Sequence, residues 1–193
     1  MLATKNPGKL KELKEIAHDC EWLELLLAPD NFIADETGQT YLENAIIKAR
    51  EAARLTGKLS LADDSGLEVF ALDGRPGVHS ARYAQGSDAT GRSKLLNELK
   101  DIKEDRKAQF VCVMVLWEPG LDKPLFHARG VWTGNIGFSE AGNLGFGYDP
   151  IFYPDETNLT AAQIPAAEKN LLSHRGKAWR NTLAYLKKNF ITA

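Results

Sequence analysis

The feature that most constrains the fold is an unbroken apolar run at residues 110–117, the longest in the chain. It is too short to cross a bilayer as a helix. Residues 108–117 are apolar at both sets of alternating positions, so they predict a central β-strand that is covered on both faces. Residues 126–133 are its expected partner strand. We therefore predict an α/β fold, with a mixed, twisted central sheet flanked by helices.

Capping and turn residues place the other elements around this strand. Asn6 followed by Pro7 predicts a helix start, and Thr40 with Glu43 forms a capping box before a helix that ends at Gly57. Apolar spacing predicts further helices at residues 93–102, 160–172 and 174–190, and strands at residues 22–27, 59–62, 67–72 and 151–153. We expect one two-lobed domain, residues 1–193, with an active-site cleft between the lobes.

Composition excludes several classes of protein. Hydrophobic residues make up 44% of the 193 positions, so the chain can bury a core and is not mainly disordered. The net charge of −2 argues against binding nucleic acid through bulk charge, although a single nucleotide needs only a local basic pocket. The N-terminus lacks the apolar core of a signal peptide. Cys20 and Cys112 have no metal-binding spacing, so we expect free thiols in a cytoplasmic protein with no membrane partner.

Residues 4–9, with the sequence TKNPGK, are the first candidate for ligand binding. A strand end, a turn and a helix start bring backbone N–H groups together, and the helix dipole favours an anion there. Lys9, on the first helical turn, can add a full positive charge. The segment lacks the pattern of a P-loop. The alternative is a plain helix cap with a solvated lysine.

Two adjacent carboxylates, Asp63 and Asp64, form the second candidate. They follow an apolar strand, and loops at strand ends are where α/β proteins place catalytic groups. Because neighbouring strand residues point to opposite faces, we expect only one of the two to face the ligand. Together with the acidic pair at residues 35–36 they could hold Mg²⁺, which takes few protein ligands and keeps its waters. An acidic pair in an ordinary turn is the alternative.

Residues 144–150, with the sequence LGFGYDP, form the third candidate. Glycine lets the backbone approach a ligand closely, Phe146 can stack on a nucleobase, and Asp149 can accept from a ring N–H. The alternative is a β-turn with core aromatics.

Basic residues near the C-terminus form the fourth candidate. Lys169 and Arg175 offer hydrogen-bond donors, and Arg175 carries a planar fork that fits oxygen acceptors. A helix junction that satisfies carbonyl groups, with a structural His174, is the alternative. Lys48 is either an ordinary surface lysine or a positive charge at the ligand-binding site. Together with the loop carboxylates, these basic groups suit a Mg²⁺-bound nucleoside phosphate, but they do not identify the bond that breaks or the base.

As a set, these motifs resemble the family of non-standard purine nucleoside triphosphate pyrophosphatases, the inosine and xanthosine triphosphatases that clean the nucleotide pool. The resemblance covers nearly the whole chain. It rests on TKNPGK at residues 4–9, ETGQTYLENA at 36–45, ADDSGLEV at 62–69, GRPGVHSARYA at 74–84, FGYDPIF at 146–152, and EKN with SHRGKA at 168–178.

This resemblance implies a reaction, a cofactor and a set of site residues. Such enzymes hydrolyse ITP, dITP and XTP to the monophosphate and pyrophosphate with Mg²⁺, which prevents incorporation of these nucleotides into DNA and RNA, and they are usually homodimers. Glu36 and Asp64 would bind Mg²⁺, and Asp64 would be the general base. Substrate binding would fall to Thr4, Lys5, Asn6, Pro7, Gly8, Lys9, Lys48, Ser65, Phe146, Gly147, Tyr148, Asp149, Lys169, His174 and Arg175.

Other functions compete with this interpretation. One is a pyrophosphatase of modified pyrimidine triphosphates, similar to the septum-inhibition Maf proteins, which a substrate panel would separate. Another is a nucleotide-sensing protein without turnover, against which the intact Asp64 and Glu36 argue. A dehalogenase-type phosphatase is disfavoured, because residues 63–65 lack that family's DxDx[TV] spacing.

Overall fold

The computed structural model describes residues 1–4 and 6–191, without the side chain of Pro7, and it divides into two compact units. Unit 1 contains Met1–Asp64, Cys112–Gly130 and the chain from His174 onward, and unit 2 contains Ser65–Val111 and Val131–Ser173. The predicted single domain and the predicted cleft stay predictions.

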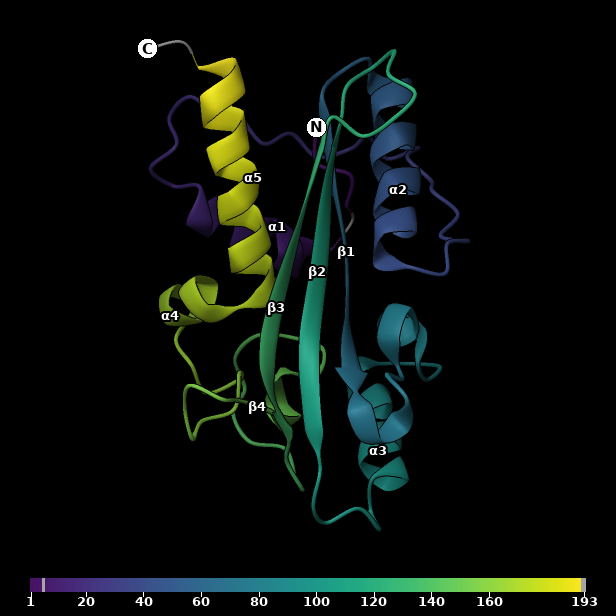
Figure 1. Cartoon of the computed structure of the whole chain (residues 1–193), viewed down its shortest axis with the longest axis vertical. Helices are drawn as coiled ribbons and strands as arrows, with labels where there is room; N and C mark the ends of the chain where they lie inside the picture. The colour runs from purple at the N-terminus through teal and green to yellow at the C-terminus, as the bar shows by residue number, and fades with distance from the viewer. Residues whose placement is uncertain (5, 192–193) are drawn as a thin grey trace. The chain divides into compact units, whose positions relative to one another are not determined.

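Helices and strands are interspersed along the chain without strict alternation (Figure 1). The helices are α1 (Pro7–Ile16), α2 (Tyr41–Thr56), α3 (Asp88–Glu98), α4 (Ala166–Leu172) and α5 (His174–Phe190). The strands are β1 (Ser60–Val69), β2 (Lys107–Trp117), β3 (Phe126–Ile136) and β4 (Phe152–Pro154). Short 3₁₀ helices are η1 (Phe70–Leu72), η2 (Gly77–Arg82) and η3 (Asp149–Ile151).

The strands form one sheet in the order β1-β2-β3-β4. β3 pairs antiparallel with β4, with Ile136 opposite Phe152. Leu2 adds parallel bridges to Leu27 and Leu61, so pairing of both directions is present. The predicted α/β class with a mixed sheet and flanking helices is confirmed.

Unit 1 packs its helices against its parts of the strands. In Figure 1, α5 and α2 lie on opposite sides of these strands, and α1 packs against α5. The indole of Trp179 is fully buried and donates from Nε1 to the carbonyl of Leu13 at 3.0 Å, which joins α5 to α1. Gly130 lets β3 approach the start of α5 closely, because a Cβ there would lie 2.0 Å from the carbonyl oxygen of His174.

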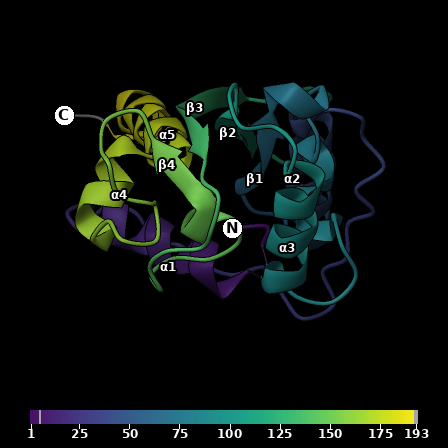
Figure 2. The same ribbon diagram turned by 90° about the horizontal axis from the view of Figure 1, so that it is seen from below.

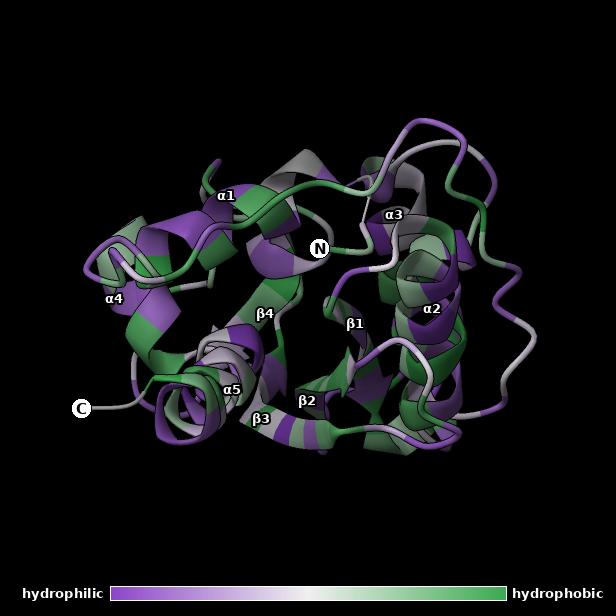
Figure 3. Cartoon of the chain, turned by 90° about the horizontal axis from the view of Figure 1, so that it is seen from above, coloured by the Kyte–Doolittle hydropathy of each residue, from purple (hydrophilic) through white to green (hydrophobic). Residues whose placement is uncertain are grey.

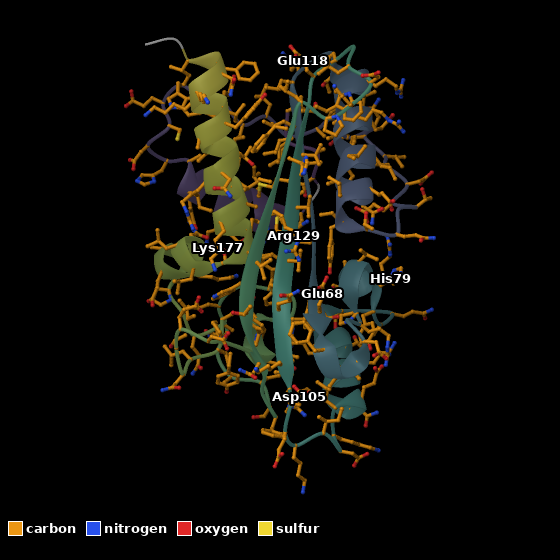
Figure 4. All side chains as sticks on the ribbon, in the orientation of Figure 1. Glu68, His79, Asp105, Glu118, Arg129 and Lys177 are labelled. Carbon is orange, nitrogen blue, oxygen red and sulfur yellow. The ribbon has the colours of Figure 1, made fainter. Side chains whose placement is uncertain are left out.

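Unit 2 has its own aromatic core. The ring of Phe152 lies 4.6 Å from that of Phe110 and 5.5 Å from that of Trp132, centroid to centroid. Figure 2 shows α3 on one side of the strands and β4 with α4 on the other. On β1, Glu68 (labelled in Figure 4) accepts a hydrogen bond from the amide of Gln109 at 2.6 Å.

Most of the predicted elements with clear local signals are confirmed. Asn6 caps α1, the Thr40–Glu43 capping box begins α2, and Gly57 ends it in a left-handed conformation, with φ of +64°. β2 is buried along nearly its whole length. β3 largely alternates between buried and exposed residues, and Figure 3 shows bands of hydrophobic and hydrophilic residues along it. α5 has the predicted bounds.

Several predicted elements differ from the structure. The strand predicted to end at residue 72 ends at Val69 and is followed by η1, and the helix predicted to end at residue 102 ends at Glu98. β1 continues through Asp63 and Asp64 rather than breaking into two strands, because ion pairs stabilise these carboxylates inside the sheet. Residues 22–27 form no strand apart from the Leu27 bridge, and Trp22 and Leu27 stay 39% and 50% exposed. α3 begins at Asp88, after a capping box at Ser87, five residues before the predicted start. α4 begins at Ala166, behind Pro165, rather than at residue 160.

Within the described part of the chain, no helix is long and apolar enough to span a membrane. Cys20 and Cys112 are both free thiols.

Candidate active site

Asp63 and Asp64 are consecutive residues of β1, and their carboxylates have different partners. Successive side chains of a strand point to opposite faces. Asp63 pairs with Lys9 and Arg175, whereas Asp64 pairs with Lys48. We call this pair and the charged residues around it the acid–base cluster. All of its residues belong to unit 1. They are Lys9, Glu12, Glu36, Lys48, Asp63, Asp64 and Arg175.

Asp63 is the buried centre of one half of this cluster, with 1% of its side chain exposed. Its Oδ2 lies 2.8 Å from Lys9 Nζ and 3.4 Å from Arg175 Nε. Arg175 Nη1 in turn donates to Glu12 Oε2 at 2.6 Å. Burial alone would raise the pKa of Asp63, but the positive charges of Lys9 and Arg175 outweigh it and hold that pKa far below its usual range. Asp63 is therefore an anion at neutral pH, and its ion pairs join α1 and α5 to β1.

Asp64 is the centre of the other half. Lys48 Nζ lies 2.9 Å from Asp64 Oδ1 and 2.7 Å from Glu36 Oε1. Asn44, one helical turn before Lys48 on α2, donates to the other oxygen of Asp64 at 3.4 Å. Burial raises the pKa of Asp64, and the opposing pull of Lys48 does not cancel this effect. A carboxylate with a raised pKa is a stronger base, which suits proton abstraction from water.

Lys48 stays charged in this position. Burial would lower the pKa of its ammonium group, but Asp64, Asp63 and the hydrogen bonds to Asp64 and Glu36 outweigh burial and raise it. The lysine is only 8% exposed, so it is not a surface lysine.

The oxygen donors of Glu36 and Asp64 fit a hard divalent cation. A positive group, the Lys48 ammonium, already lies between one oxygen of each, which shows that the two carboxylates converge on one cation-sized position. Mg²⁺ is typically held by one or two carboxylates together with substrate phosphates and waters. Among the described residues, no three His, Cys, Asp or Glu side chains form a group that could hold a metal ion by themselves.

Asn6 is the N-cap residue of α1, and Thr4 supports it. Asn6 Oδ1 accepts from the backbone N–H groups of Gly8 at 2.8 Å and Lys9 at 3.2 Å, and Asn6 N–H donates to Thr4 Oγ1 at 3.1 Å. Lys9 is not a solvated lysine, because it pairs with buried Asp63. Lys5 and the side chain of Pro7 lie outside the described residues.

In unit 2, the loop at residues 145–149 is built around Asp149. Asp149 Oδ2 accepts from the backbone N–H of Phe146 at 2.9 Å and from Lys169 Nζ at 2.7 Å. Lys169 Nζ also lies 5.3 Å from the centre of the Phe146 ring. Gly145 has a φ of +74°, and a Cβ there would lie 2.0 Å from Asp149 Oδ2, so only glycine fits.

The first turns of α3 hold the same loop by its backbone. Asp88 Oδ2 accepts from Gly147 N–H at 2.7 Å, and Arg92 Nη1 donates to the Gly147 carbonyl at 2.8 Å. Arg92 Nε lies 3.0 Å from Glu140 Oε1. The hydroxyl of Tyr148 donates to the carbonyl of Ser80 at 3.0 Å, and burial raises its pKa. The loop is thus fixed before any ligand arrives.

The predicted site residues therefore fall into two groups. Unit 1 brings together Lys9, Glu36, Lys48, Asp64 and Arg175, and places buried His174 beside Arg175 at the start of α5. Unit 2 brings together Phe146, Gly147, Tyr148, Asp149 and Lys169, and contains Ser65, which directly follows Asp64 in β1. Their assignment to substrate stays a prediction.

Sequence reasoning missed Glu12, Asn44, Asp88 and Arg92. Helical spacing could have identified the first two, because Glu12 lies three residues after Lys9 and Asn44 lies four residues before Lys48. Asp88 and Arg92 required the correct start of α3, which the Ser87 capping box indicates.

Comparison with known proteins identifies the family. A model of the Ham1 family matches residues 1–185. The chain belongs to the Ham1 family. The dITP/XTP pyrophosphatase of Photorhabdus laumondii subsp. laumondii is 48% identical over 195 residues, which covers 97% of each chain. Two Ham1 proteins of known structure share the fold. Each match covers 97% of this chain and 97% of the chain of known structure. The protein from Staphylococcus aureus has a TM-score of 0.85 at 41% identity, and that from Coxiella burnetii has 0.85 at 43%. The resemblance predicted from the motifs is confirmed.

Proposed function

We propose that this chain hydrolyses the non-standard purine nucleoside triphosphates dITP, XTP and ITP to monophosphate and pyrophosphate, and so removes them from the nucleotide pool. The observation that supports this most strongly is the convergence of Glu36 and Asp64 on one buried positive charge, in a Ham1 family member. Ham1 relatives are named dITP/XTP pyrophosphatases.

Asp64 is the general base in this proposal. It takes a proton from water, the water oxygen bonds to the α-phosphorus, and the bond from that phosphorus to the bridging oxygen breaks. Pyrophosphate leaves with the bridging oxygen and the electron pair of the broken bond. Asn44 donates to the other oxygen of Asp64 at 3.4 Å and keeps the carboxylate oriented for this proton transfer.

Glu36 and Asp64 are the residues that would hold Mg²⁺. When bound, the ion stabilises negative charge on the phosphate oxygens. Lys48 and Lys9 contribute positive charge that stabilises the departing pyrophosphate. The N-terminal turn of α1, with Thr4, Asn6 and Gly8, and the hydroxyl of Ser65 supply further phosphate contacts.

Recognition of the base follows from hydrogen-bond polarity. Hypoxanthine and xanthine present an O6 acceptor, whereas adenine presents an N6 donor. Arg175 and Lys169 are donors without an acceptor, so they match the first two bases and mismatch adenine. Phe146 stacks on the purine, Asp149 accepts from a ring N–H, and His174, Gly147 and Tyr148 complete the contacts.

We further propose a cytoplasmic homodimer that binds no nucleic acid. The two free thiols and the net charge of −2 support this setting. Sedimentation of the purified protein tests the dimer.

A substrate panel tests the proposed function. The panel contains ITP, dITP, XTP, ATP, GTP and modified pyrimidine triphosphates, each assayed with and without Mg²⁺ for monophosphate and pyrophosphate. We expect turnover of the first three, dependent on Mg²⁺. Preference for a pyrimidine triphosphate would favour a Maf-like activity, and binding of ITP without turnover would favour a nucleotide sensor.

A further inference from the structure

Lys48 holds the two carboxylates that are the proposed metal ligands. Its Nζ lies 2.7 Å from Glu36 Oε1 and 2.9 Å from Asp64 Oδ1. A Mg²⁺ ion lies about 2.0–2.1 Å from its ligand oxygens, so an ion bound to the same two oxygens would lie against the ammonium group. Two cations in contact repel strongly in a buried site. The ammonium and the metal therefore compete for one position.

We propose that Lys48 is a built-in competitor of the metal: in the metal-free protein it occupies the cation position of Glu36 and Asp64, and it leaves that position for the phosphates of an arriving nucleoside triphosphate. The inference rests on the proposed function for the identity of the triphosphate. It concerns the order of events at the site rather than the reaction itself.

The surrounding residues permit this movement without loss of the site. Lys48 has a flexible four-carbon stem, whereas the carboxylate of Asp64 is attached to β1 and accepts a second hydrogen bond from Asn44 at 3.4 Å. Asn44 therefore still orients Asp64 when the ammonium leaves. On α2, which carries Lys48, the side chains of Ala45, Ala49 and Ala52 are fully buried, and this packing keeps the backbone of the helix in place.

A coupling between two ligands follows. The free protein binds a divalent ion weakly, because the ion must displace Lys48. A polyphosphate offers the ammonium another anion and so raises the affinity for the ion. Linkage is reciprocal, so the ion raises the affinity for the polyphosphate by the same factor. The site thus favours assembly of metal and substrate together over binding of metal alone.

Binding of Mn²⁺ to the protein without nucleotide tests the proposal. Electron paramagnetic resonance of free Mn²⁺ gives the dissociation constant for wild type and for Lys48→Met, which keeps the length of the side chain and removes its charge. We expect Mn²⁺ to bind about tenfold tighter or more to Lys48→Met. Lys9→Met is the matched control, because Lys9 pairs with Asp63 instead, and we expect a change below about threefold. Adding Glu36→Gln to Lys48→Met should abolish the gain.

Lys48→Gln provides a second uncharged side chain, and circular dichroism checks that each variant is folded. Equal or weaker Mn²⁺ binding by the folded variants would overturn the proposal, and so would absence of Mn²⁺ binding by every variant. Failure of the proposed function gives a different pattern. If Lys48→Met gains affinity while wild type releases no pyrophosphate from dITP, the competition stands and the assigned substrate is wrong.

Discussion

Two neighbouring aspartates of β1 illustrate how contacts, rather than residue type, assign a role. Asp63 is surrounded by the charges of Lys9 and Arg175, which hold its pKa far below the usual range. Asp64 is buried against a single ammonium group, and its pKa is raised. The first carboxylate stabilises the protein, and the second is the better proton acceptor.

Replacing Asp64 by asparagine should remove the base and keep the shape of the side chain. We expect kcat for dITP to fall by about a hundredfold or more, the scale of lost general-base catalysis. Steady-state kinetics measure this change, and an unchanged thermal midpoint would show that the fold is intact. Near-normal turnover would mean that another group is the base.

Replacing Asp63 by asparagine should instead destabilise the protein. Lys9 and Arg175 would lose a buried partner, so we expect the free energy of unfolding at pH 7 to fall by about 3 kcal/mol. Urea denaturation measures it. Glu51→Gln, which breaks an ion pair with the exposed Arg54, is the control and should change the free energy of unfolding far less than Asp63→Asn does.

The stability difference between wild type and Asp63→Asn should depend on pH. A depressed folded-state pKa stabilises the protein above the unfolded pKa of about 3.9, and this stabilisation is lost as pH falls from there toward the folded-state pKa. The difference between wild type and Asp63→Asn should therefore shrink below about pH 4. A difference that stays constant from pH 7 to pH 3 would contradict the assigned pKa direction.

Arg175 combines a structural contact with a proposed specificity role. Arg175→Ala should reduce kcat/KM for ITP strongly and for ATP little, so that the ITP/ATP preference shrinks about tenfold. The variant also removes the partner of Glu12 and Asp63. Because the ratio of two substrates cancels the amount of active enzyme, it isolates the specificity effect. Equal losses for ITP and ATP would remove Arg175 from base recognition.

At the scale of elements, α3 positions the loop at residues 145–149. Asp88 and Arg92 hold the N–H and the carbonyl of Gly147 from one helical face. Lys169 on α4 fixes the same loop through Asp149. Residues of α3 and α4 therefore set the conformation of the loop at residues 145–149, which has no helix or strand until η3 begins at Asp149.

Arg92→Ala should loosen this loop. A lost charged hydrogen bond is worth about 1.5–3 kcal/mol, so we expect KM for dITP to rise about tenfold while kcat stays within about twofold. Arg92→Lys keeps the charge without the fork and should be intermediate, and Arg54→Ala is an exposed control. A fall in kcat that follows a fall in the thermal midpoint would indicate a purely structural role.

At the scale of the whole molecule, local signals were readable from the sequence and long-range pairing was not. Asn6, Thr40 and Gly57 predicted helix ends correctly, because caps depend on neighbours within a few residues. The strand break at Asp63 was wrongly predicted, because the pairing of β1 and its buried cations come from distant segments. The family resemblance singled out Glu36, Lys48 and Asp64, but only the structure shows that Lys48 lies on both carboxylates.

In the proposed reaction, water attacks the α-phosphorus of a non-standard purine triphosphate. Hydrolysis of dITP in oxygen-18-labelled water, followed by mass spectrometry of both products, tests it most directly. We predict one labelled oxygen in the deoxyinosine monophosphate and none in the pyrophosphate. Label in the pyrophosphate, or release of a diphosphate with orthophosphate, would contradict the claim.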